Sequence, residues 1–309
     1  MKRGFTLVEL LVVIAIIGLI MGLMMPAIGS ARASARQVKC KSNLRQIALA
    51  CNNHASTHKH FPTSISYGKE GSRPRENCSG RGWICLILPH VEQEALYREL
   101  EPGFEGNYAS GTGMNLPALS EVVKTVVPLF CCPDDPEVTE MNTSTAPMGG
   151  GYGISGSQTN YKGVMGDNRL WRTTIHPGNS HICVSTTGCT GIFYRNNYQE
   201  PVSFARIKDG ISRTFLLGED VVAHNRHNLT FFANGDYSSC SPPLNYTRNP
   251  LVPGEWWNVM GFRSQHVGGA HFAFADGSVT FINEDINHDI YRALSTKNGA
   301  ELIDEMELP

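Results

Sequence analysis

The longest apolar run of the chain stands at its N-terminus. Residues 5–25 read FTLVELLVVIAIIGLIMGLMM, with Glu9 as their one charged residue, and they follow a short basic head, MKRG, at residues 1–4. A helix rises about 1.5 Å per residue, so this run would extend roughly 30 Å, the thickness of a membrane's hydrocarbon core. The pattern predicts a membrane-spanning helix over 5–25, with the basic head in the cytoplasm.

The helical pattern continues beyond the membrane segment. Apolar residues recur at a helical period over residues 40–55, and the positions between them are mostly basic or polar, so one face suits a protein core. Pro26 should kink or locally open the helix. The helix should end before Pro62, because a residue that precedes proline avoids the α region. We therefore expect a soluble helical segment over 26–60, whose buried stripe comprises Cys40, Leu44, Ile47, Ala48, Cys51 and Ala55.

Residues 61–309 change in character, because glycine, proline, serine and asparagine become frequent and the apolar runs shorten. This composition predicts a globular domain. Its expected elements are a buried strand or turn from residue 83 that leads at Pro89 into a helix over 90–99, a helical pattern over 116–129, a loop over 134–158, a buried strand over 215–217 and a short helix over 287–294.

The clearest element of this domain is the segment AHFAFADGSVTFI at residues 270–282. Asp-Gly between alternating apolar residues is a strong signal for a hairpin with a two-residue type I′ turn. That turn would place Asp276 and Gly277 at the tip and put two apolar pairs on one face, Phe274 with Val279 and Phe272 with Phe281. With the long helix packed on such an antiparallel sheet, the predicted fold class is α+β.

Composition narrows the functional classes. A hydrophobic content of 41% and a charged content of 17% suit a protein with a real core, and a net charge of −2 leaves no basic footprint for nucleic acid. The nine cysteines are an odd number, so an oxidising compartment would permit some disulfides and leave at least one thiol. We expect Cys40 on the helix and Cys132 in the domain to bridge the two.

Glu9 is the residue of the apolar run that points to function. A carboxylate inside a membrane span is costly and usually has a partner. If the chain is cut between Gly4 and Phe5, the new α-amino group lies one helical turn from Glu9 and can pair with it in the same or an adjacent copy. Two other interpretations remain: an ordinary secretory signal, cut near ARASA at residues 31–35, and a plain single-pass anchor with an incidental glutamate.

The segment GFTLVELLVVIAIIGLI resembles the cleavage and methylation segment of type IV prepilins and of type II secretion pseudopilins. The resemblance implies that Gly4 precedes a cut by prepilin peptidase, that Phe5 becomes the N-methylated first residue and that Glu9 supports methylation and assembly. It also implies residence in the bacterial inner membrane, other pilin-like subunits as partners, a globular domain in the periplasm or outside the cell, and no enzymatic activity.

A second resemblance lies in the segment HVGGAHFAFADGSVTFI, which is similar to the H-X9-DG motif of a large bacterial family of prepilin-type proteins of poorly defined role. Its motif residues are His266, Asp276 and Gly277. We expect His266 to cap or hydrogen-bond the hairpin, ahead of a metal-binding or a catalytic role, and the turn itself explains Asp276. Further matches occur at residues 40–46, 132–134, 160–161, 209–219 and 294–302.

Other candidate chemistry is weaker. Asp134, Asp135, Glu137 and Glu140 form an acidic stretch that a calcium ion could use, but the spacing is not that of an EF-hand, so a solvated loop is favoured. His54, His58 and His60 are interpreted as a polar helix face. Nucleophile-elbow, Walker and dinucleotide motifs are absent from the sequence.

Two functional hypotheses follow. The leading one is a structural subunit of a pilus-like or pseudopilus-like assembly, anchored in the inner membrane. The alternative is a membrane-anchored periplasmic module that binds a solute or carbohydrate and does not polymerise, because a domain over 61–309 is larger than pilin packing requires.

Overall fold

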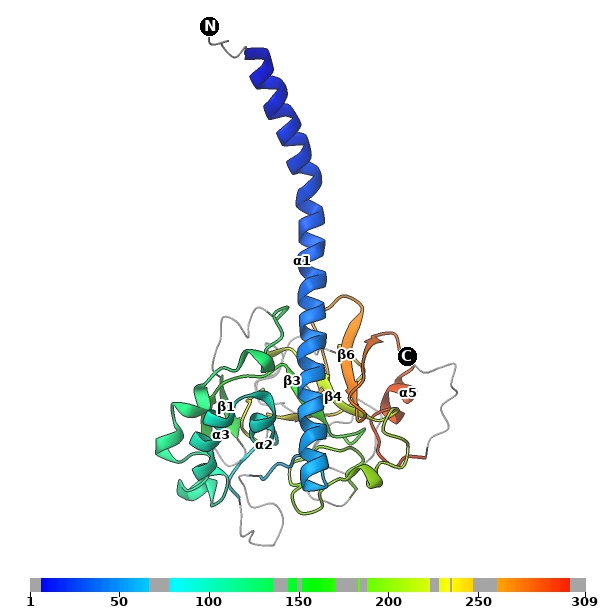
Figure 1. The fold of residues 1–309 in the computed structure, drawn as a ribbon. Coiled ribbons are helices and arrows are strands. Elements are labelled where there is room, and N and C mark those ends of the chain that lie inside the picture. The colour runs from blue at the N-terminus through cyan, green and yellow to red at the C-terminus, as the bar shows by residue number, and fades with distance from the viewer. Residues whose placement is uncertain are drawn as a thin grey trace.

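A computed structural model describes residues 7–66, 78–135, 144–148, 152–169, 183, 188–222, 228–233, 235–246 and 260–300. The first helix, α1 (Leu7–His58), runs through 52 residues without a break, Pro26 included. Its first half projects from the domain and leans away from the axis of its second half (Figure 1). The predicted long helix and its end before Pro62 are confirmed.

The projecting half of α1 is apolar and uncovered. Its most hydrophobic window has a mean hydropathy of 2.8, and none of that window is buried in the domain. The large apolar side chains from Leu7 to Ile28 are exposed, from 45% to 75% of their surface. Exposure on this scale is unfavourable in water and suits a lipid environment.

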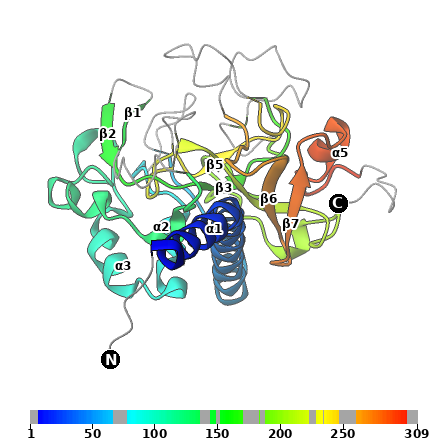
Figure 2. The same ribbon diagram turned by 90° about the horizontal axis from the view of Figure 1, so that it is seen from above.

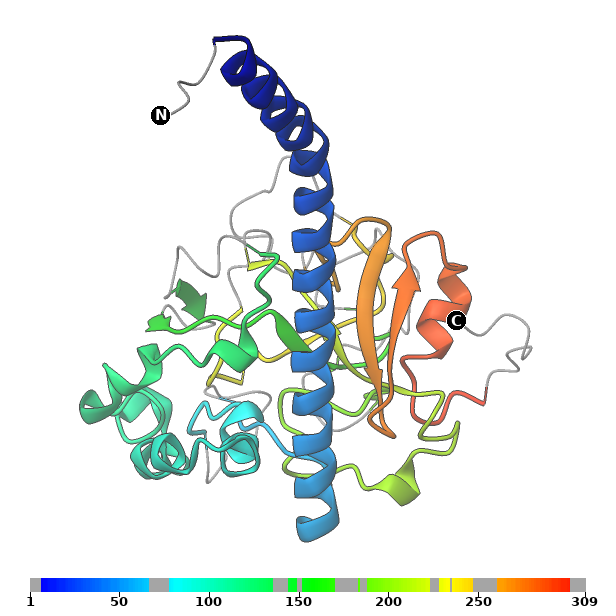
Figure 3. The same cartoon turned by 45° about the horizontal axis from the view of Figure 1, so that its top comes forward.

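The second half of α1 lies along the domain (Figure 3). All six residues of the predicted apolar stripe are buried, which confirms the helical period assigned to residues 40–55. This half packs against strands β4 (Phe215–Glu219), β6 (Gly269–Phe274) and β7 (Val279–Asn283) of a central sheet, and against short helices on its other side (Figure 2).

The central sheet has five strands in the order β5-β3-β4-β6-β7, antiparallel except for the parallel pair β3 and β5. Its strands are β3 (Tyr161–Val164), β4 (Phe215–Glu219), β5 (Tyr237–Ser238), β6 (Gly269–Phe274) and β7 (Val279–Asn283). The buried strand predicted at 215–217 is therefore confirmed, as is the α+β class. Behind the face that holds α1, a second apolar cluster includes Phe215, Phe262, Phe272 and Tyr291.

The hairpin at β6 and β7 is present, but its predicted register is wrong by one residue. Ala273 pairs with Val279, and His271 pairs with Phe281. The reason is a longer loop: Phe274 N–H donates to Ser278 O at 2.9 Å, and Gly277 adopts φ 88°. This is the three-residue loop with a glycine bulge, in place of a two-residue turn. Because a one-residue slip reverses the faces, Phe281 lies beside His271.

The remaining elements are short. They are α2 (Ile84–Ile87), α3 (Glu94–Leu100), α5 (His288–Ala293), β1 (Ser144–Met148), β2 (Tyr152–Gly156) and the 3₁₀ helices η1 (Leu88–Val91), η2 (Glu101–Gly103), η3 (Tyr108–Ser110), η4 (Pro117–Leu119), η5 (Val122–Lys124), η6 (Pro128–Phe130) and η7 (Phe204–Arg206). Three predictions need correction. The segment from residue 83, predicted as a buried strand or turn, begins with a turn at Trp83 and continues as the short helix α2 in place of a strand. Three separate 3₁₀ turns replace one helix over 116–129, and an antiparallel pair, β1 with β2, crosses the predicted loop. Prolines at 117 and 128 begin two of those turns, since proline suits the first helical position.

Candidate functional site at the junction of helix and sheet

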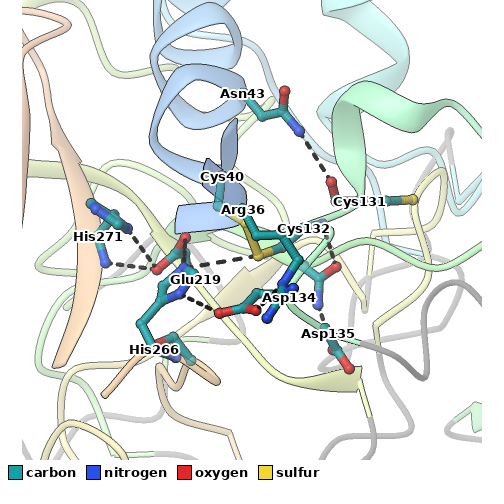
Figure 4. Close-up of a disulfide and its surroundings, with 12 residues drawn as sticks. Arg36, Cys40, Asn43, Cys131, Cys132, Asp134, Asp135, Glu219, His266 and His271 are labelled. Carbon is teal, nitrogen blue, oxygen red and sulfur yellow. Dashed lines mark hydrogen bonds and ion pairs between the residues drawn. A yellow bond between two sulfur atoms is a disulfide. The ribbon is translucent and has the colours of Figure 1, made fainter. Parts of the chain in front are cut away.

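Glu219, the last residue of β4, is the centre of a buried polar network beside α1 (Figure 4). Its carboxylate accepts the backbone N–H of His271 at 2.7 Å and lies 3.3 Å from His271 Nδ1. Its second oxygen lies 3.3 Å from His266 Nε2. The side chains of Glu219 and both histidines are at most 4% exposed, so the network is shielded from water.

His266 extends this network to the helix. Its Nδ1 lies 2.9 Å from Asp134 Oδ2, and Asp134 in turn forms an ion pair with Arg36 Nε of α1 at 2.6 Å. The chain of contacts therefore runs from α1 through a loop and the segment before β6 to the end of β4. Sequence separations of 98, 132 and 47 residues join the members, so the folded domain alone brings them together.

The charges of the network reinforce one another. Burial lowers the pKa of His266, but hydrogen bonds and attraction to Glu219 and Asp134 outweigh burial and raise it above its usual value. Burial alone would raise the pKa of Glu219. Its hydrogen bonds with both histidines outweigh burial, so the pKa of Glu219 is lowered. Both nitrogens of His266 face carboxylates, which accept when ionised, so the imidazolium donates twice.

A disulfide lies against this network. Cys40 of α1 is bonded to Cys132, and Cys132 Sγ lies 3.9 Å from His266 Nε2. Nearby hydrogen bonds join the helix to the same region, from Asn43 Nδ2 to Cys131 O and from Tyr161 Oη to Cys40 O, each 3.1 Å long. The predicted bridge between helix and domain is confirmed. A second disulfide joins Cys183 to Cys189, and the other five cysteines form none.

Removal of the Cys40–Cys132 bridge is expected to lower the free energy of unfolding by about 2–4 kcal/mol, because the bridge restrains a long loop in the unfolded chain. The variant is Cys40→Ala with Cys132→Ala, and urea unfolding of the detergent-solubilised chain measures the loss. The control is Cys183→Ala with Cys189→Ala, which opens a loop with a sequence separation of 6 in place of 92. Equal losses in the two variants would contradict the loop-length argument.

The network is poorly suited to metal binding or to catalysis in this state. Ligand atoms of Cys40, Cys132, Glu219 and His266 lie within 4.8 Å of one another. Zinc prefers thiolate sulfur, however, and these two sulfurs are joined as a disulfide. A doubly hydrogen-bonded imidazolium also has no lone pair with which to bind a metal or take a proton. The arrangement instead holds α1 against the sheet.

The two ends of the H-X9-DG motif both lie next to α1. His266 meets the helix through Asp134 and the disulfide. At the far end of β6, a Cβ placed on Gly277 would lie 3.2 Å from Asn52 Nδ2 and 3.4 Å from Leu49 Cδ2. The spacing between His266 and Asp276 thus contains all of β6, the strand that packs against α1. His266 therefore belongs to the contact between α1 and the sheet, and it does not cap the hairpin.

The turn residues of the motif have local roles as well. Asp276 Oδ1 accepts hydrogen bonds from the backbone N–H and the hydroxyl of Ser278, at 2.8 and 2.7 Å, which is the expected role of an aspartate in a turn. Gly277 occupies the left-handed region, which favours glycine. Of the predicted processing residues, Glu9 lies on the exposed first turn of α1, whereas Gly4 and Phe5 lie outside the described residues.

The acidic stretch is not a solvated loop where it is described. Asp134 pairs with Arg36 and His266, and Asp135, 2% exposed, accepts from Asn160 Nδ2 at 2.7 Å and from Val222 N–H at 3.0 Å. These carboxylates therefore bind protein groups. The calcium interpretation also involved Glu137 and Glu140, which lie outside the described residues.

A second buried charge cluster adjoins the site. Asp220 lies 3.2 Å from Lys162 Nζ and 3.1 Å from Arg263 Nη1, and none of the three side chains is more than 2% exposed. Burial lowers the pKa of Lys162. Glu219 at the end of β4 and Asp220 directly after it are thus two neighbouring buried acids with different cationic partners. Sequence reasoning considered His271, with His266 and Asp276, for a metal site or a hydrolytic dyad and ranked both below a structural role. It assigned no role to Glu219 or Asp220, although two acids directly after the buried run FLLG were a signal.

The pKa of His266 gives a pH dependence with a definite sign. Because its pKa is raised on folding, its stabilisation is fully present below about pH 6.5, the usual histidine pKa, and is lost as pH rises through the folded pKa. We expect the free energy of unfolding to fall as the pH rises above about 6.5, and the fall to be smaller in His266→Gln. Urea unfolding over a pH series measures both slopes. Parallel slopes would show that His266 does not carry the effect.

Comparison with known proteins agrees with the two resemblances. A model described as "Prokaryotic N-terminal methylation motif" matches residues 1–25, and a model described as "Protein of unknown function (DUF1559)" matches residues 29–289. No curated protein and no solved structure matches the chain. The methylation motif implies processing by prepilin peptidase and anchoring in the membrane, in agreement with the exposed apolar half of α1. The chain belongs to the DUF1559 family and is a type IV pilin-like protein with a prepilin methylation motif on its N-terminal helix.

Proposed function

We propose that this protein is a structural subunit that assembles with other pilin-like subunits into a pilus-like or pseudopilus-like fibre at the bacterial inner membrane. The observation that carries the proposal is the bare apolar half of α1, which the domain leaves uncovered from Leu7 to Ile28. After release from the membrane, such a surface needs other helices around it.

Glu9 provides this packing with a specific ionic contact. A carboxylate in the first turn of α1 is costly in lipid unless a cation meets it. Cleavage between Gly4 and Phe5 supplies that cation as the new α-amino group. In an assembly, the amino group of one copy pairs with Glu9 of its neighbour, which sets the register of adjacent helices.

The orientation proposed for the subunit follows from the charges at residues 1–4. Lys2 and Arg3 precede the apolar run, and basic residues favour the cytoplasmic side. The domain that follows residue 60 is then in the periplasm or outside the cell. An oxidising compartment of that kind also suits the two disulfides.

The decisive experiment is the N-terminus of the mature protein, read by mass spectrometry from cells with and without prepilin peptidase. We expect N-methylphenylalanine at residue 5, and the unprocessed chain when the peptidase is absent. Crosslinking in the same membranes is expected to give a ladder of multimers. An N-terminus near residue 34 or 36 would indicate ordinary secretion, and retention of residues 1–4 alongside active peptidase would refute the assignment.

One observation favours the binding module as the second candidate. A pocket of about 250 Å³ lies between η3, η5 and β2, with apolar and polar residues in its lining. Tyr108, Asn115 and Lys124 are among its lining residues. This volume suits a ligand smaller than typical drug-sized molecules. A lone monomer in the crosslinking experiment would favour this candidate over the fibre.

A further inference from the structure

Four residues with metal-binding side chains converge beside α1, from four separate segments of the chain (Figure 4). They are Cys40, Cys132, Glu219 and His266, and one ligand atom of each lies within 4.8 Å of the ligand atoms of the other three. All four residues are buried. We call them the reducible cluster, because a disulfide joins two of its members.

The distances within the reducible cluster suit a tetrahedral ion. Bonds of about 2.0–2.3 Å to zinc place neighbouring ligand atoms roughly 3.3–3.8 Å apart. His266 Nε2 lies 3.3 Å from Glu219 Oε1 and 3.9 Å from Cys132 Sγ. Thiolate, imidazole and carboxylate are also the donor groups that zinc takes in proteins. The bond between the two sulfurs is what prevents coordination, because zinc binds the thiolate form of cysteine.

Neighbouring groups hold two of the ligands in orientations that a metal site requires. His266 Nδ1 lies 2.9 Å from Asp134 Oδ2, and Arg36 pairs with that aspartate in turn. Histidines that bind zinc commonly donate their other ring nitrogen to a carboxylate in this way, which fixes the ring and directs Nε2 at the ion. The second oxygen of Glu219 accepts the backbone N–H of His271 at 2.7 Å, so Oε1 remains directed at the cluster.

The reducible cluster is enclosed but lies close to solvent. The side chain of His266 is 1% exposed, whereas its partner Asp134 is 14% exposed and Arg36, the next residue outward, is 44% exposed. An ion can therefore enter where the ion pair between Asp134 and Arg36 opens. Once inside, it is shielded from water, which strengthens its attraction to the anionic ligands.

We infer that the reducible cluster, once the bridge between Cys40 and Cys132 is reduced, binds one Zn²⁺ ion through both thiolates, His266 Nε2 and Glu219 Oε1. A dithiol reductant supplies two electrons and two protons, so the S–S bond breaks, two thiols form and the reductant becomes a disulfide. Zinc binding then releases both thiol protons and the proton on His266 Nε2. The ion joins the two segments that the disulfide joined, so α1 stays attached to the domain in either redox state. This inference does not depend on the proposed assembly.

The test compares the oxidised and reduced forms of the full chain in detergent, without a polyhistidine tag and in the absence of oxygen. A phosphine serves as the reductant because it binds zinc weakly, and the count of thiols must rise from five to nine. Titration of the reduced chain with Co²⁺, a spectroscopic substitute for Zn²⁺, is expected to show one ion per chain, with thiolate-to-metal charge transfer and tetrahedral d–d absorption. Zn²⁺ should displace the Co²⁺. The oxidised chain should show neither absorption.

Three variants test the ligands. His266→Gln leaves the bridge to form during folding and removes one ligand, so the affinity of the reduced chain for Zn²⁺ should fall by about 100-fold or more. Asp134→Ala removes only the group that orients the ring, and a smaller fall of about 10- to 100-fold is expected. Cys40→Ser with Cys132→Ser should abolish the charge-transfer absorption.

Two controls test whether other thiols bind the ion. Cys183→Ala with Cys189→Ala removes the second disulfide, and Cys131→Ser removes the thiol next to Cys132. Both proteins should bind Zn²⁺ as the wild type does. Zn²⁺ should also raise the urea midpoint of the reduced wild type, because binding to the folded state stabilises that state.

The outcome is decided even if the reduced chain unfolds without metal. In that case Zn²⁺ must restore the circular dichroism of the folded wild type and must fail to restore that of His266→Gln. Absence of binding at micromolar Zn²⁺ in the reduced wild type would overturn the inference. Equal affinity in the reduced wild type and in reduced His266→Gln would overturn it as well.

Discussion

Replacement of Glu9 by leucine is expected to leave the protein in the membrane and to impair its assembly or its N-methylation. Leucine removes the one charge in the apolar run, so the cost of insertion falls by about 2–3 kcal/mol and the anchor becomes more stable in lipid. Assembly, in contrast, loses the carboxylate that meets the α-amino group of a neighbouring copy. A contact of about 1–2 kcal/mol per subunit corresponds to a change of about 5- to 30-fold at each interface.

The measurement is the ratio of crosslinked multimers to monomer in isolated membranes, together with N-methylation of residue 5 by mass spectrometry. Glu9→Asp retains the charge on a shorter side chain and should keep part of the assembly. Val12→Leu changes a neighbouring apolar position without touching charge and serves as the matched control. Normal ladders in Glu9→Leu would show that helix packing in the fibre does not use this carboxylate.

Asp220→Ala is expected to be the most destabilising single change within the globular domain, by about 3–5 kcal/mol. The substitution leaves Lys162 and Arg263 side by side with no more than 2% exposure and without the acid between them. Two buried cations then repel each other, and neither can recover its hydration without opening the sheet. Urea unfolding followed by tryptophan fluorescence, to which buried Trp83 contributes, measures the loss.

A matched control for this change is Asp289→Ala. Asp289 also pairs with an arginine, Arg292, at 3.3 Å, but its side chain is 87% exposed. Exposed pairs contribute little, so the expected change is within about 0.5 kcal/mol. Asp220→Asn removes the negative charge but keeps one hydrogen-bond acceptor oxygen, so it separates the loss of charge from the loss of hydrogen bonding. A loss below about 1 kcal/mol in Asp220→Ala would mean that the cluster is hydrated or relaxes at little cost.

Features governed by local periodicity could be predicted from the sequence. The long helix, its buried stripe and the strand at 215–217 follow from the spacing of apolar residues, and the structure has all three. The bridge from Cys40 to Cys132 was also expected and is present. The sequence predicted the hairpin correctly but not its register. Asp-Gly occurs both in the two-residue turn and in the longer loop with a glycine bulge, so the dipeptide does not distinguish them.

The buried network could not be predicted, since nothing local marks its partners. Arg36, Asp134, Glu219 and His266 are brought together by the packing of α1 on the sheet, and each has chemically equal alternatives elsewhere in the chain. The contacts among His54, His58, His60 and His90 show the same limit. His54 and His58 were adjacent by helical spacing, but His90 comes from η1 and its approach depends on the tertiary fold. His60 lies beside His54 because the left-handed conformation of Lys59 turns the chain back at the end of the helix.

The bridge at Cys40 also has a mechanical consequence. If the anchor is pulled while the far end of the domain is held, covalent tension passes from residue 40 directly to residue 132. The intervening 91 residues, with a sequence separation of 92 between the bonded cysteines, then form a side loop that bears no load along its backbone. Force could then unfold the strands that follow residue 132. Helix α1 would stay attached to the domain until a covalent bond broke.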